Sequence, residues 1–270
     1  MKNIITLNLK LIIALTGAVL LLASCQKYKD VADADYPDQL IYMPAAIGGN
    51  YLINSISYST GDTPTPGAPF RFTVDLANNK FIVPLSVYRS GVNNKGGFNV
   101  DIAVNTDTVT NLLTAGTLTD TGILPASNYS IPSSVNIPDG KEVISFDLVI
   151  DLNYLRTSAT QYIALGVGVS STERKSNPKL ETSVVVIDTQ IMRPIPDFTF
   201  SMDVKKVDFA NNSQFSKNYI WDFGDGTATS SDTEPTHTYL NAGTYTVILK
   251  AIGITGDEDK SIKTATVTIL

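Results

Sequence analysis

The chain has 270 residues, with 20 lysines and arginines against 26 aspartates and glutamates, and a formal net charge of −6. No cluster of basic residues interrupts this acidic balance, which argues against a nucleic-acid partner. The single cysteine excludes an internal disulfide, so stability has to come from buried cores. Glycine, proline and many small polar and β-branched residues favour β-sandwiches over helical folds.

The N-terminus predicts a targeting segment. Lys2 and Lys10 supply positive charge, and the apolar run from Leu11 to Leu22 is too short to span a bilayer as a helix. The next letters, "LASC", resemble the bacterial lipoprotein signal, which implies cleavage before Cys25 and acylation of that residue, with palmitate among the acyl groups. A secretion signal followed by an incidental cysteine is the alternative.

This resemblance predicts a lipoprotein signal peptide over residues 1–24 and a polar, lipid-anchored tether over residues 25–38. Several acyl chains on one cysteine give firm membrane retention, because a single chain binds only marginally. The charged start of the tether is similar to the signals that send Bacteroidota lipoproteins to the outer face of the outer membrane. We therefore expect a membrane-anchored protein at the cell surface.

Residues 39–191 carry strand patterns with a period of two. The runs 80–89, 98–104 and 142–151 alternate apolar and polar side chains, as half-buried strands require. The side chains expected to face inward are Phe81, Val83, Leu85 and Val87, then Phe98, Val100, Ile102 and Val104, and finally Ile144, Phe146, Leu148 and Ile150. The run from Asp107 to Gly116 is the one helical candidate. Many short strands with one helix predict an antiparallel β-sandwich.

The stretch "MRPIPD", from Met192 to Asp197, interrupts these patterns. Two prolines one residue apart cannot continue a central strand, and they predict a semi-rigid connector. We place a domain boundary here, followed by a second β-domain over residues 196–270, which is long enough for a small sandwich. The fold expected for the chain is all-β, with two β-sandwich domains in tandem.

The second domain resembles the PKD family. The resemblance rests on "VDFANNS", "YIWDFGDG", "PTHTYLNAGTYTVILKA" and "ATVTIL", which follow one another in the family's order. It implies an immunoglobulin-like β-sandwich that acts as a spacer or contact module in an extracellular protein. Domains of this family often stand beside carbohydrate-active domains.

The first domain resembles a module of unknown function found in Bacteroidota surface lipoproteins. The resemblance rests on "NYSIPSSVNIPDGKEVISFDLVIDLNYLRTSATQYIALGV" and extends over about residues 38–189. In such lipoproteins the module often follows the lipid anchor and precedes glycan-binding or glycan-cleaving domains. The resemblance therefore implies a role at the cell surface near glycans.

The stretch "WDFGDG" has the composition of an active site but the pattern of a turn. Trp221 and Phe223 are two apart, so both should face the core, while Asp222 points outward. The triplet Gly224, Asp225, Gly226 fits a tight hairpin with positive φ angles, held by carboxylate bonds to backbone N–H groups. The alternatives, a general acid and base or a Ca²⁺ site, lack the closer regular spacing of calcium loops.

His237 and Tyr239 are also two apart, on the strand expected after that loop. His237 is the only histidine, so it cannot be one of several imidazoles around zinc. No G-x-S-x-G nucleophile motif accompanies it, and packing is the favoured role. We predict no catalytic residue, metal or cofactor, and we assign the WDFGDG residues, His237 and Tyr239 to structure.

Seven tyrosines fall in the first domain, and exposed ones could form a platform for glycans, although core or edge positions with a satisfied hydroxyl are the plainer interpretation. They are Tyr42, Tyr51, Tyr58, Tyr88, Tyr129, Tyr154 and Tyr162. The leading hypothesis is a lipid-anchored surface protein that contacts or captures an extracellular polymer, a polysaccharide above all, without catalysis. The alternatives are a protein–protein adhesion or spacer component of an outer-membrane complex, and a hydrolase with paired carboxylates.

Overall fold

The computed structural model describes residues 38–56, 72–91 and 93–270. The expected signal peptide, Cys25, nearly all of the expected tether, and Tyr58 lie outside the described residues. The chain folds as two β-sandwiches in tandem, which confirms the expected fold class. We call them the N-terminal domain, which holds β1 to β12, and the C-terminal domain, which holds β13 to β18.

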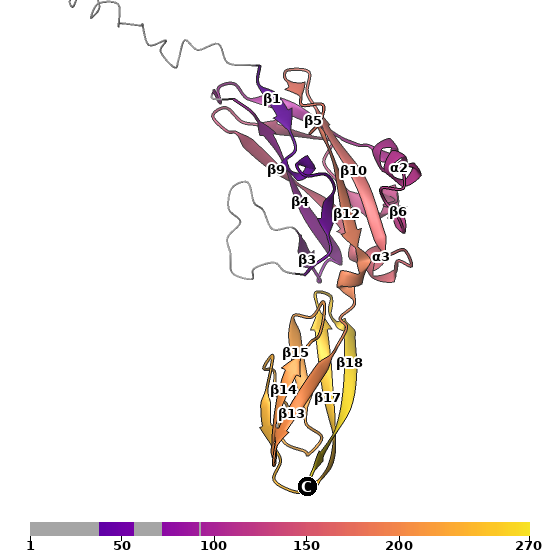
Figure 1. Cartoon of the computed structure of the whole chain (residues 1–270). Coiled ribbons are helices and arrows are strands. Elements are labelled where there is room, and N and C mark those ends of the chain that lie inside the picture. Colours follow the sequence, from indigo (N-terminus) through magenta and orange to yellow (C-terminus); the bar gives the residue numbers. More distant parts are fainter. Residues whose placement is uncertain (1–37, 57–71, 92) are drawn as a thin grey trace, which may run out of the picture. The chain divides into compact units, whose positions relative to one another are not determined.

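The N-terminal domain consists of two sheets that face each other. The first has the order β11-β1-β4-β9-β7, with β3 beside β4, and the second has the order β2-β12-β10-β5-β8, with β6 beside β10. The first sheet comprises β1 (Leu40–Tyr42), β3 (Thr73–Asp75), β4 (Lys80–Arg89), β7 (Tyr129–Ser130), β9 (Val143–Asp151) and β11 (Lys175–Ser176). The second comprises β2 (Tyr51–Ile53), β5 (Phe98–Val104), β6 (Thr121–Ile123), β8 (Ser134–Ile137), β10 (Tyr162–Ser170) and β12 (Thr182–Asp188). Figure 1 shows β4 and β9 in one layer and β10 and β12 in the other.

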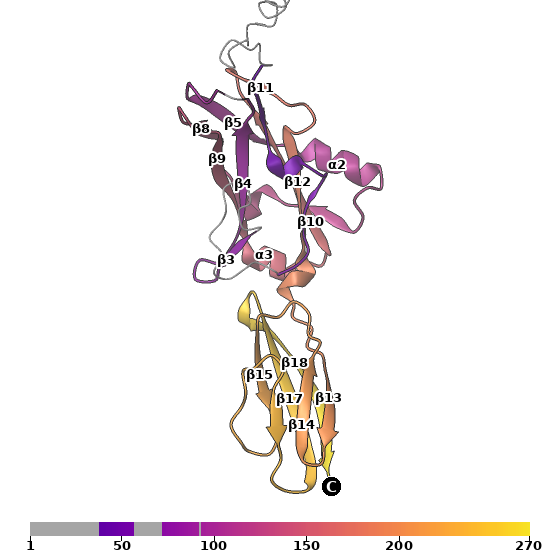
Figure 2. The ribbon, with the colours of Figure 1, turned by 60° about the vertical axis from the view of Figure 1, so that its left-hand side comes forward.

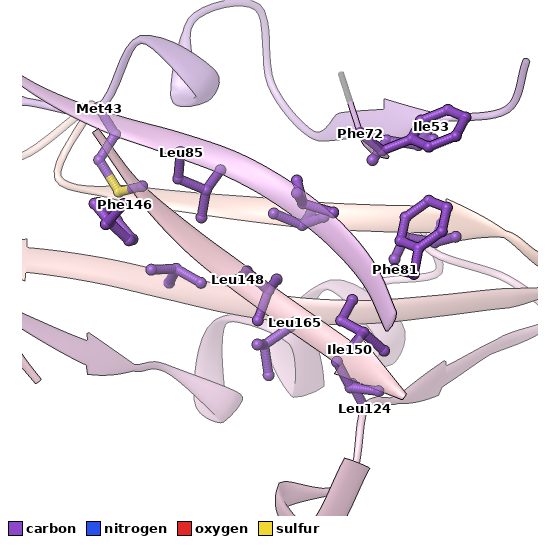
Figure 3. Packing of buried hydrophobic residues seen from close by; sticks show 14 of the residues in the cluster. Met43, Ile53, Phe72, Phe81, Leu85, Leu124, Phe146, Leu148, Ile150 and Leu165 are labelled. Carbon is purple, nitrogen blue, oxygen red and sulfur yellow. The ribbon is translucent and has the colours of Figure 1, made fainter. Parts of the chain in front are cut away.

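The core lies between these sheets and is formed by the alternating residues of the strands. Leu85, Phe146, Leu148 and Leu165 meet there, with Met43 at one end (Figure 3). Nearly all of the side chains expected to face inward are buried, and Val104 and Ile144 are half-buried at strand ends. The period-two interpretation of β4, β5 and β9 is therefore confirmed.

Helix α2 (Thr106–Thr114) covers the outer face of the second sheet (Figures 1 and 2). Asn105 caps its first turn, because the Asn105 side chain accepts a hydrogen bond from the Thr108 N–H. Val109 packs there against Ala164 of β10 and Val184 and Val186 of β12, in a second apolar cluster. The helical prediction for residues 107–116 is confirmed within two residues.

Two features differ from the sequence prediction. The sheets are not wholly antiparallel, because β1 pairs with β11, β6 with β10 and β2 with β12 in parallel. Alternation of apolar and polar residues does not predict whether a short strand pairs in parallel or antiparallel with its neighbour. The expectation of one helix was also wrong: α3 (Leu152–Thr157) follows β9, and its six residues are too few to produce a helical period. Short 3₁₀ helices, η2 (Pro44–Ala46), η3 (Ala126–Asn128) and η4 (Thr189–Met192), complete the domain.

The C-terminal domain packs two three-stranded sheets face to face, in an immunoglobulin-like sandwich. One sheet has the order β13-β14-β16 and the other the order β15-β17-β18. Their strands are β13 (Phe198–Asp203), β14 (Lys206–Asn211), β15 (Asn218–Asp222), β16 (Thr236–Thr238), β17 (Gly243–Gly253) and β18 (Gly256–Ile269). The chain between β15 and β16 therefore passes from one sheet to the other, and it begins with the last four residues of the WDFGDG stretch, Phe223 to Gly226.

Candidate functional site

The WDFGDG stretch leaves β15 and forms two consecutive side-chain-supported turns. Asp222 Oδ1 accepts a hydrogen bond from the Gly224 N–H at 2.9 Å. Asp225 Oδ1 accepts one from the Thr227 N–H at 3.1 Å and a second from the Thr227 hydroxyl at 2.6 Å. Each aspartate thus holds the backbone two residues further on, as in an Asx turn.

The expected tight Asp-Gly hairpin was wrong in its details. Gly224 and Gly226 have φ angles of 75° and 81°, whereas Asp225 is not among the residues with positive φ. The two flanking strands belong to different sheets, so no two-residue hairpin can join them. A single bridge between Trp221 and Ser230 closes the loop instead.

Trp221 and Phe223 lie in the core of the C-terminal domain. The Trp221 ring is fully buried. Its centroid lies 5.1 Å from that of Phe198, which it meets edge-on, and 5.3 Å from that of Phe209, which is tilted against it. The Trp221 indole N–H donates to the carbonyl oxygen of Asp232 at 3.0 Å. This bond gives the buried ring a polar partner and ties the loop to the core.

His237 and Tyr239 pack behind this turn in a row of rings. The His237 ring stacks on Phe223, with ring centroids 4.0 Å apart and an interplanar angle of 1°. It meets Tyr239 edge-on, with ring centroids 4.7 Å apart. His237 Nε2 lies 2.8 Å from Asp225 Oδ2. The buried Tyr239 hydroxyl donates to the carbonyl oxygen of Phe223 at 3.0 Å. His237 in β16 and Tyr239 directly after it therefore both contact the turn and hold it in place.

The electrostatics of this turn follow from its hydrogen bonds. Burial raises the pKa of Asp225, but the bonds from Thr227 and His237 outweigh it and lower that pKa to about 2. Burial, with the charge of Asp225 nearby, raises the pKa of Tyr239 to about 12. Asp225 is charged and Tyr239 is protonated at neutral pH, and these are the states that their hydrogen bonds require.

The turn has little chemistry to offer a ligand. The Asp225 and His237 side chains are 10% and 13% exposed, and both Asp225 oxygens already accept hydrogen bonds from the protein. Within residues 38–56, 72–91 and 93–270, no group of three or more His, Cys, Asp or Glu side chains could hold a metal ion. The hydrogen bonds of these side chains hold the turn in place within the domain.

The lowered pKa of Asp225 predicts acid sensitivity of the C-terminal domain. The unfolded aspartate has a pKa of about 3.9, so its contribution to stability is complete above about pH 5. That contribution is lost as the pH falls towards the folded pKa of about 2. The free energy of unfolding of Asp225→Asn should therefore fall less than that of the wild type between pH 4 and pH 2. Urea titrations followed by the fluorescence of Trp221 would measure this, and equal slopes would contradict it.

The tyrosines of the N-terminal domain divide into two groups. Tyr51, Tyr129 and Tyr154 pack against the main core, and Tyr162 packs against the cluster beneath α2. Tyr42 and Tyr88 belong to neither cluster. These two alone, among the described tyrosines of this domain, stand on the surface of a sheet with no part in an apolar core.

Tyr42 and Tyr88 lie side by side on the outer face of the first sheet. They are register partners on β1 and β4, and their ring centroids are 5.8 Å apart with an interplanar angle of 33°. Their neighbours Ile41 and Val87 are buried, so the two rings point away from the core. Both rings are half-buried, and no hydrogen bond from either hydroxyl occurs in the part of the chain that the structure describes.

Polar side chains continue this face along β9. Ser145 and Asp147 are exposed and lie opposite Ser86 and Pro84 of β4. We call the surface formed by Tyr42, Tyr88, Ser145 and Asp147 the tyrosine face. Tyr42 and Tyr88 are 46 positions apart, and Tyr88 and Ser145 are 57 apart. Strand alternation predicts the direction of each side chain, but nothing in the sequence predicts that the three strands meet.

The fold and its sites define a chain of two tandem β-sandwiches, of which the second is a PKD domain. The PKD family model matches residues 193–269. A model described as an N-terminal domain matches residues 37–176, which is more than half of the chain. The chain therefore belongs to the family that this N-terminal domain defines.

Two of the similar solved structures are PKD domains, and a third covers most of this chain. The PKD1 domain of the Vibrio cholerae metalloprotease PrtV is 30% identical, and the match covers 28% of this chain and 96% of that one, with a TM-score of 0.27. The PKD1 domain of Vibrio anguillarum Epp is also 30% identical, with coverages of 28% and 93% and a TM-score of 0.26. A Bacteroides ovatus protein, provisionally assigned as carbohydrate-binding, is 10% identical, with coverages of 85% and 70% and a TM-score of 0.40.

A curated relative matches over a longer segment. The pre-pro-metalloprotease PrtV of Vibrio cholerae serotype O1 is 30% identical over 132 residues, which are 47% of this chain. The chain spans 12% of the length of that protease. Neither matched family model describes a catalytic domain. Among the residues that the structure describes, no helix has the length and apolar character needed to cross a membrane.

Proposed function

We propose that this chain is a lipid-anchored protein of the outer membrane that contacts an extracellular polysaccharide at the cell surface, without catalysis. The observation that carries the proposal is the tyrosine face. Its two adjacent rings offer apolar surface beside hydroxyl and carboxylate groups on the outer face of a sheet. A sheet face of this kind suits a polymer that lies along it.

The chemistry of the face suits sugars. A sugar ring has an apolar face of C–H groups, which aromatic side chains cover, and a rim of hydroxyls, which need hydrogen-bonding partners. The Tyr42 and Tyr88 hydroxyls can each donate and accept one such bond, and Ser145 and Asp147 stand further along the same face. Only Asp147 carries charge among these four residues, so a neutral polysaccharide fits better than an anionic one.

The non-catalytic part of the proposal rests on what the domains contain. The carboxylates of the WDFGDG turn are already held by Thr227, His237 and backbone N–H groups. Neither matched family model describes a catalytic domain, which supports this part of the proposal. A binding module needs only a stable surface, and two sandwiches provide one.

Binding to polysaccharide should depend on the two rings. In affinity electrophoresis through gels that contain neutral polysaccharides, the double variant Tyr42→Ala/Tyr88→Ala should lose most of the retardation of the wild type. Each ring that stacks on a sugar contributes apolar contact that alanine cannot replace. The control is Val204→Ala, which removes an 82% exposed side chain from the C-terminal domain and should leave retardation unchanged. Unchanged retardation of the double variant would contradict the role of the tyrosine face.

Membrane attachment should depend on the cysteine. Cys25→Ser should move the protein from the detergent phase to the aqueous phase in phase partitioning, because the acyl chains supply the retention. Surface location is tested by protease treatment of intact cells, which should remove the wild-type protein. Detergent-phase partitioning that survives the substitution would contradict the lipid anchor.

A protein–protein spacer remains the second candidate, because the C-terminal domain exposes apolar side chains. Val204 is 82% exposed and Leu240 is 79% exposed. The two lie close together, since Lys205 Nζ donates to the Leu240 carbonyl at 2.7 Å. If these residues bind a partner, Val204→Asp should abolish its recovery after cross-linking in outer membranes, while retardation by polysaccharide is unchanged.

A further inference from the structure

We propose that the N-terminal domain has a second binding site, a pocket on the outer face of its second sheet that accepts a single neutral sugar residue. This inference rests on the proposed function, since it names a ligand of the same class. The pocket has a volume of about 250 Å³ and is lined by Asn50, Leu52, Thr117, Leu118, Thr119, Thr121, Tyr162 and Val186.

The end of α2 builds one wall of the pocket. Gly116 has a φ of 69°, and its N–H bonds to the Leu113 carbonyl at 3.0 Å while the Thr117 N–H bonds to the Leu112 carbonyl at 2.9 Å. This pair of bonds is the Schellman motif, which ends a helix and turns the chain sharply. The turn brings the segment Thr117–Thr119 to the mouth of the pocket, directly before β6.

The sheet supplies the opposite wall and the floor. Tyr162 begins β10, and its register partner on β6 is Thr121. Val186 on β12, which is 3% exposed, pairs with Leu52 on the edge strand β2. Four separate segments of the chain therefore converge on the pocket. Because the strands are hydrogen-bonded to each other, the pocket is formed before any ligand binds.

The lining is uncharged and combines two kinds of surface. Leu52, Val186 and the ring of Tyr162 give an apolar floor. The hydroxyls of three threonines and the amide of Asn50 stand around it. The Thr121 hydroxyl donates to the Thr119 carbonyl at 2.8 Å, whereas neither the Tyr162 hydroxyl nor the Asn50 amide has a hydrogen-bond partner among the described residues. A charged ligand would find no counter-ion here, and a purely apolar ligand that covered the Tyr162 hydroxyl and the Asn50 amide would leave them unpaired.

A neutral sugar satisfies both surfaces. Its C–H face can cover the tyrosine ring, and its hydroxyls can bond with the threonine hydroxyls and the amide. The volume is below the range of about 300–1,000 Å³ that is typical of drug-sized ligands, so the pocket suits one ring and not a chain. The tyrosine face lies on the first sheet and the pocket on the second, so the pocket can take a chain end or a side branch.

The test measures binding of free monosaccharides to the purified chain. Glucose, galactose, mannose and N-acetylglucosamine are the neutral probes, and glucuronate is the charged control. In protein-observed NMR titrations we expect one of the neutral probes to bind with a dissociation constant of roughly 1 mM, as its size allows. Resonances of residues that line the pocket should shift, and glucuronate should not shift them.

Variants connect the binding to the pocket. Asn50→Ala and Thr117→Val change exposed residues, so they should leave the fold intact and weaken binding by about threefold to tenfold, which corresponds to one lost hydrogen bond. Tyr162→Ala should abolish binding, and Tyr162→Phe should retain part of it if the ring is used. The matched control is Asn111→Ala, which removes the same side chain from the exposed surface of α2 outside the pocket.

The outcomes separate this inference from the proposed function. Polysaccharide retardation with no binding of any neutral monosaccharide would overturn the pocket and leave the proposed function standing. Equal loss of affinity in Asn50→Ala and Asn111→Ala would also overturn it. Stronger binding of glucuronate than of the neutral probes would overturn the neutral class of ligand, and shifts confined to the tyrosine face would overturn the pocket as the site.

Discussion

Trp221→Ala should cost the C-terminal domain about 3–5 kcal/mol of stability, because it removes a large buried side chain and leaves a cavity. The ring is fully buried and contacts Phe198 and Phe209, and its N–H holds the Asp232 carbonyl. The free energy of unfolding of native proteins is about 5–15 kcal/mol, so this substitution should remove a large part of the domain's stability. Calorimetry of the full chain would measure the loss.

The adjacent residue gives the control for Trp221. Ile220 lies on the same strand, points to the other face and is 36% exposed. Ile220→Ala should therefore cost under about 1 kcal/mol. If both variants lost similar amounts, the stability of the domain would not depend on the core that Trp221 fills.

Gly224→Ala should also destabilise the C-terminal domain strongly. A Cβ at this position would lie 2.3 Å from the carbonyl oxygen of Thr246, which belongs to the backbone of β17 and cannot move freely. The φ of 75° adds the cost of a left-handed conformation, about 1–2 kcal/mol. With the clash, we expect a loss of about 2–5 kcal/mol.

Gly226 separates the two causes. Its φ is 81°, but a Cβ there would have no atom within 4 Å. Gly226→Ala should therefore cost only the backbone strain, about 1–2 kcal/mol. Urea unfolding followed by the fluorescence of Trp221 would compare the variants. Equal losses of stability in Gly224→Ala and Gly226→Ala would contradict the expected clash with the Thr246 carbonyl.

The period-two alternation of the sequence predicted most of the core. Trp221 and Phe223 are two apart at the end of β15, so strand alternation predicts that they share one face, and both are buried. The same reasoning applies to Phe81 and Leu85. Alternation works because burial on a sheet depends on side-chain direction, which the strand fixes locally.

What depends on contacts between distant segments was beyond such reasoning. Direction of pairing is one example: β2 and β6 pair in parallel, and side chains alternate between the faces of a strand whatever the direction of its partner. The route of the WDFGDG loop from one sheet to the other is another, and it replaced the hairpin that Asp225-Gly226 suggested. The two binding surfaces are further examples, because Tyr42 and Tyr88, or Asn50 and Tyr162, meet only after the sheets form.

One measurement tests the central proposal most directly. The purified chain is run through gels that contain neutral polysaccharides, and the same polysaccharides are then assayed for new reducing ends after incubation with the protein. We predict retardation by at least one polysaccharide with no increase in reducing ends. Free migration in every gel would contradict the binding function, and an increase in reducing ends would contradict its non-catalytic character.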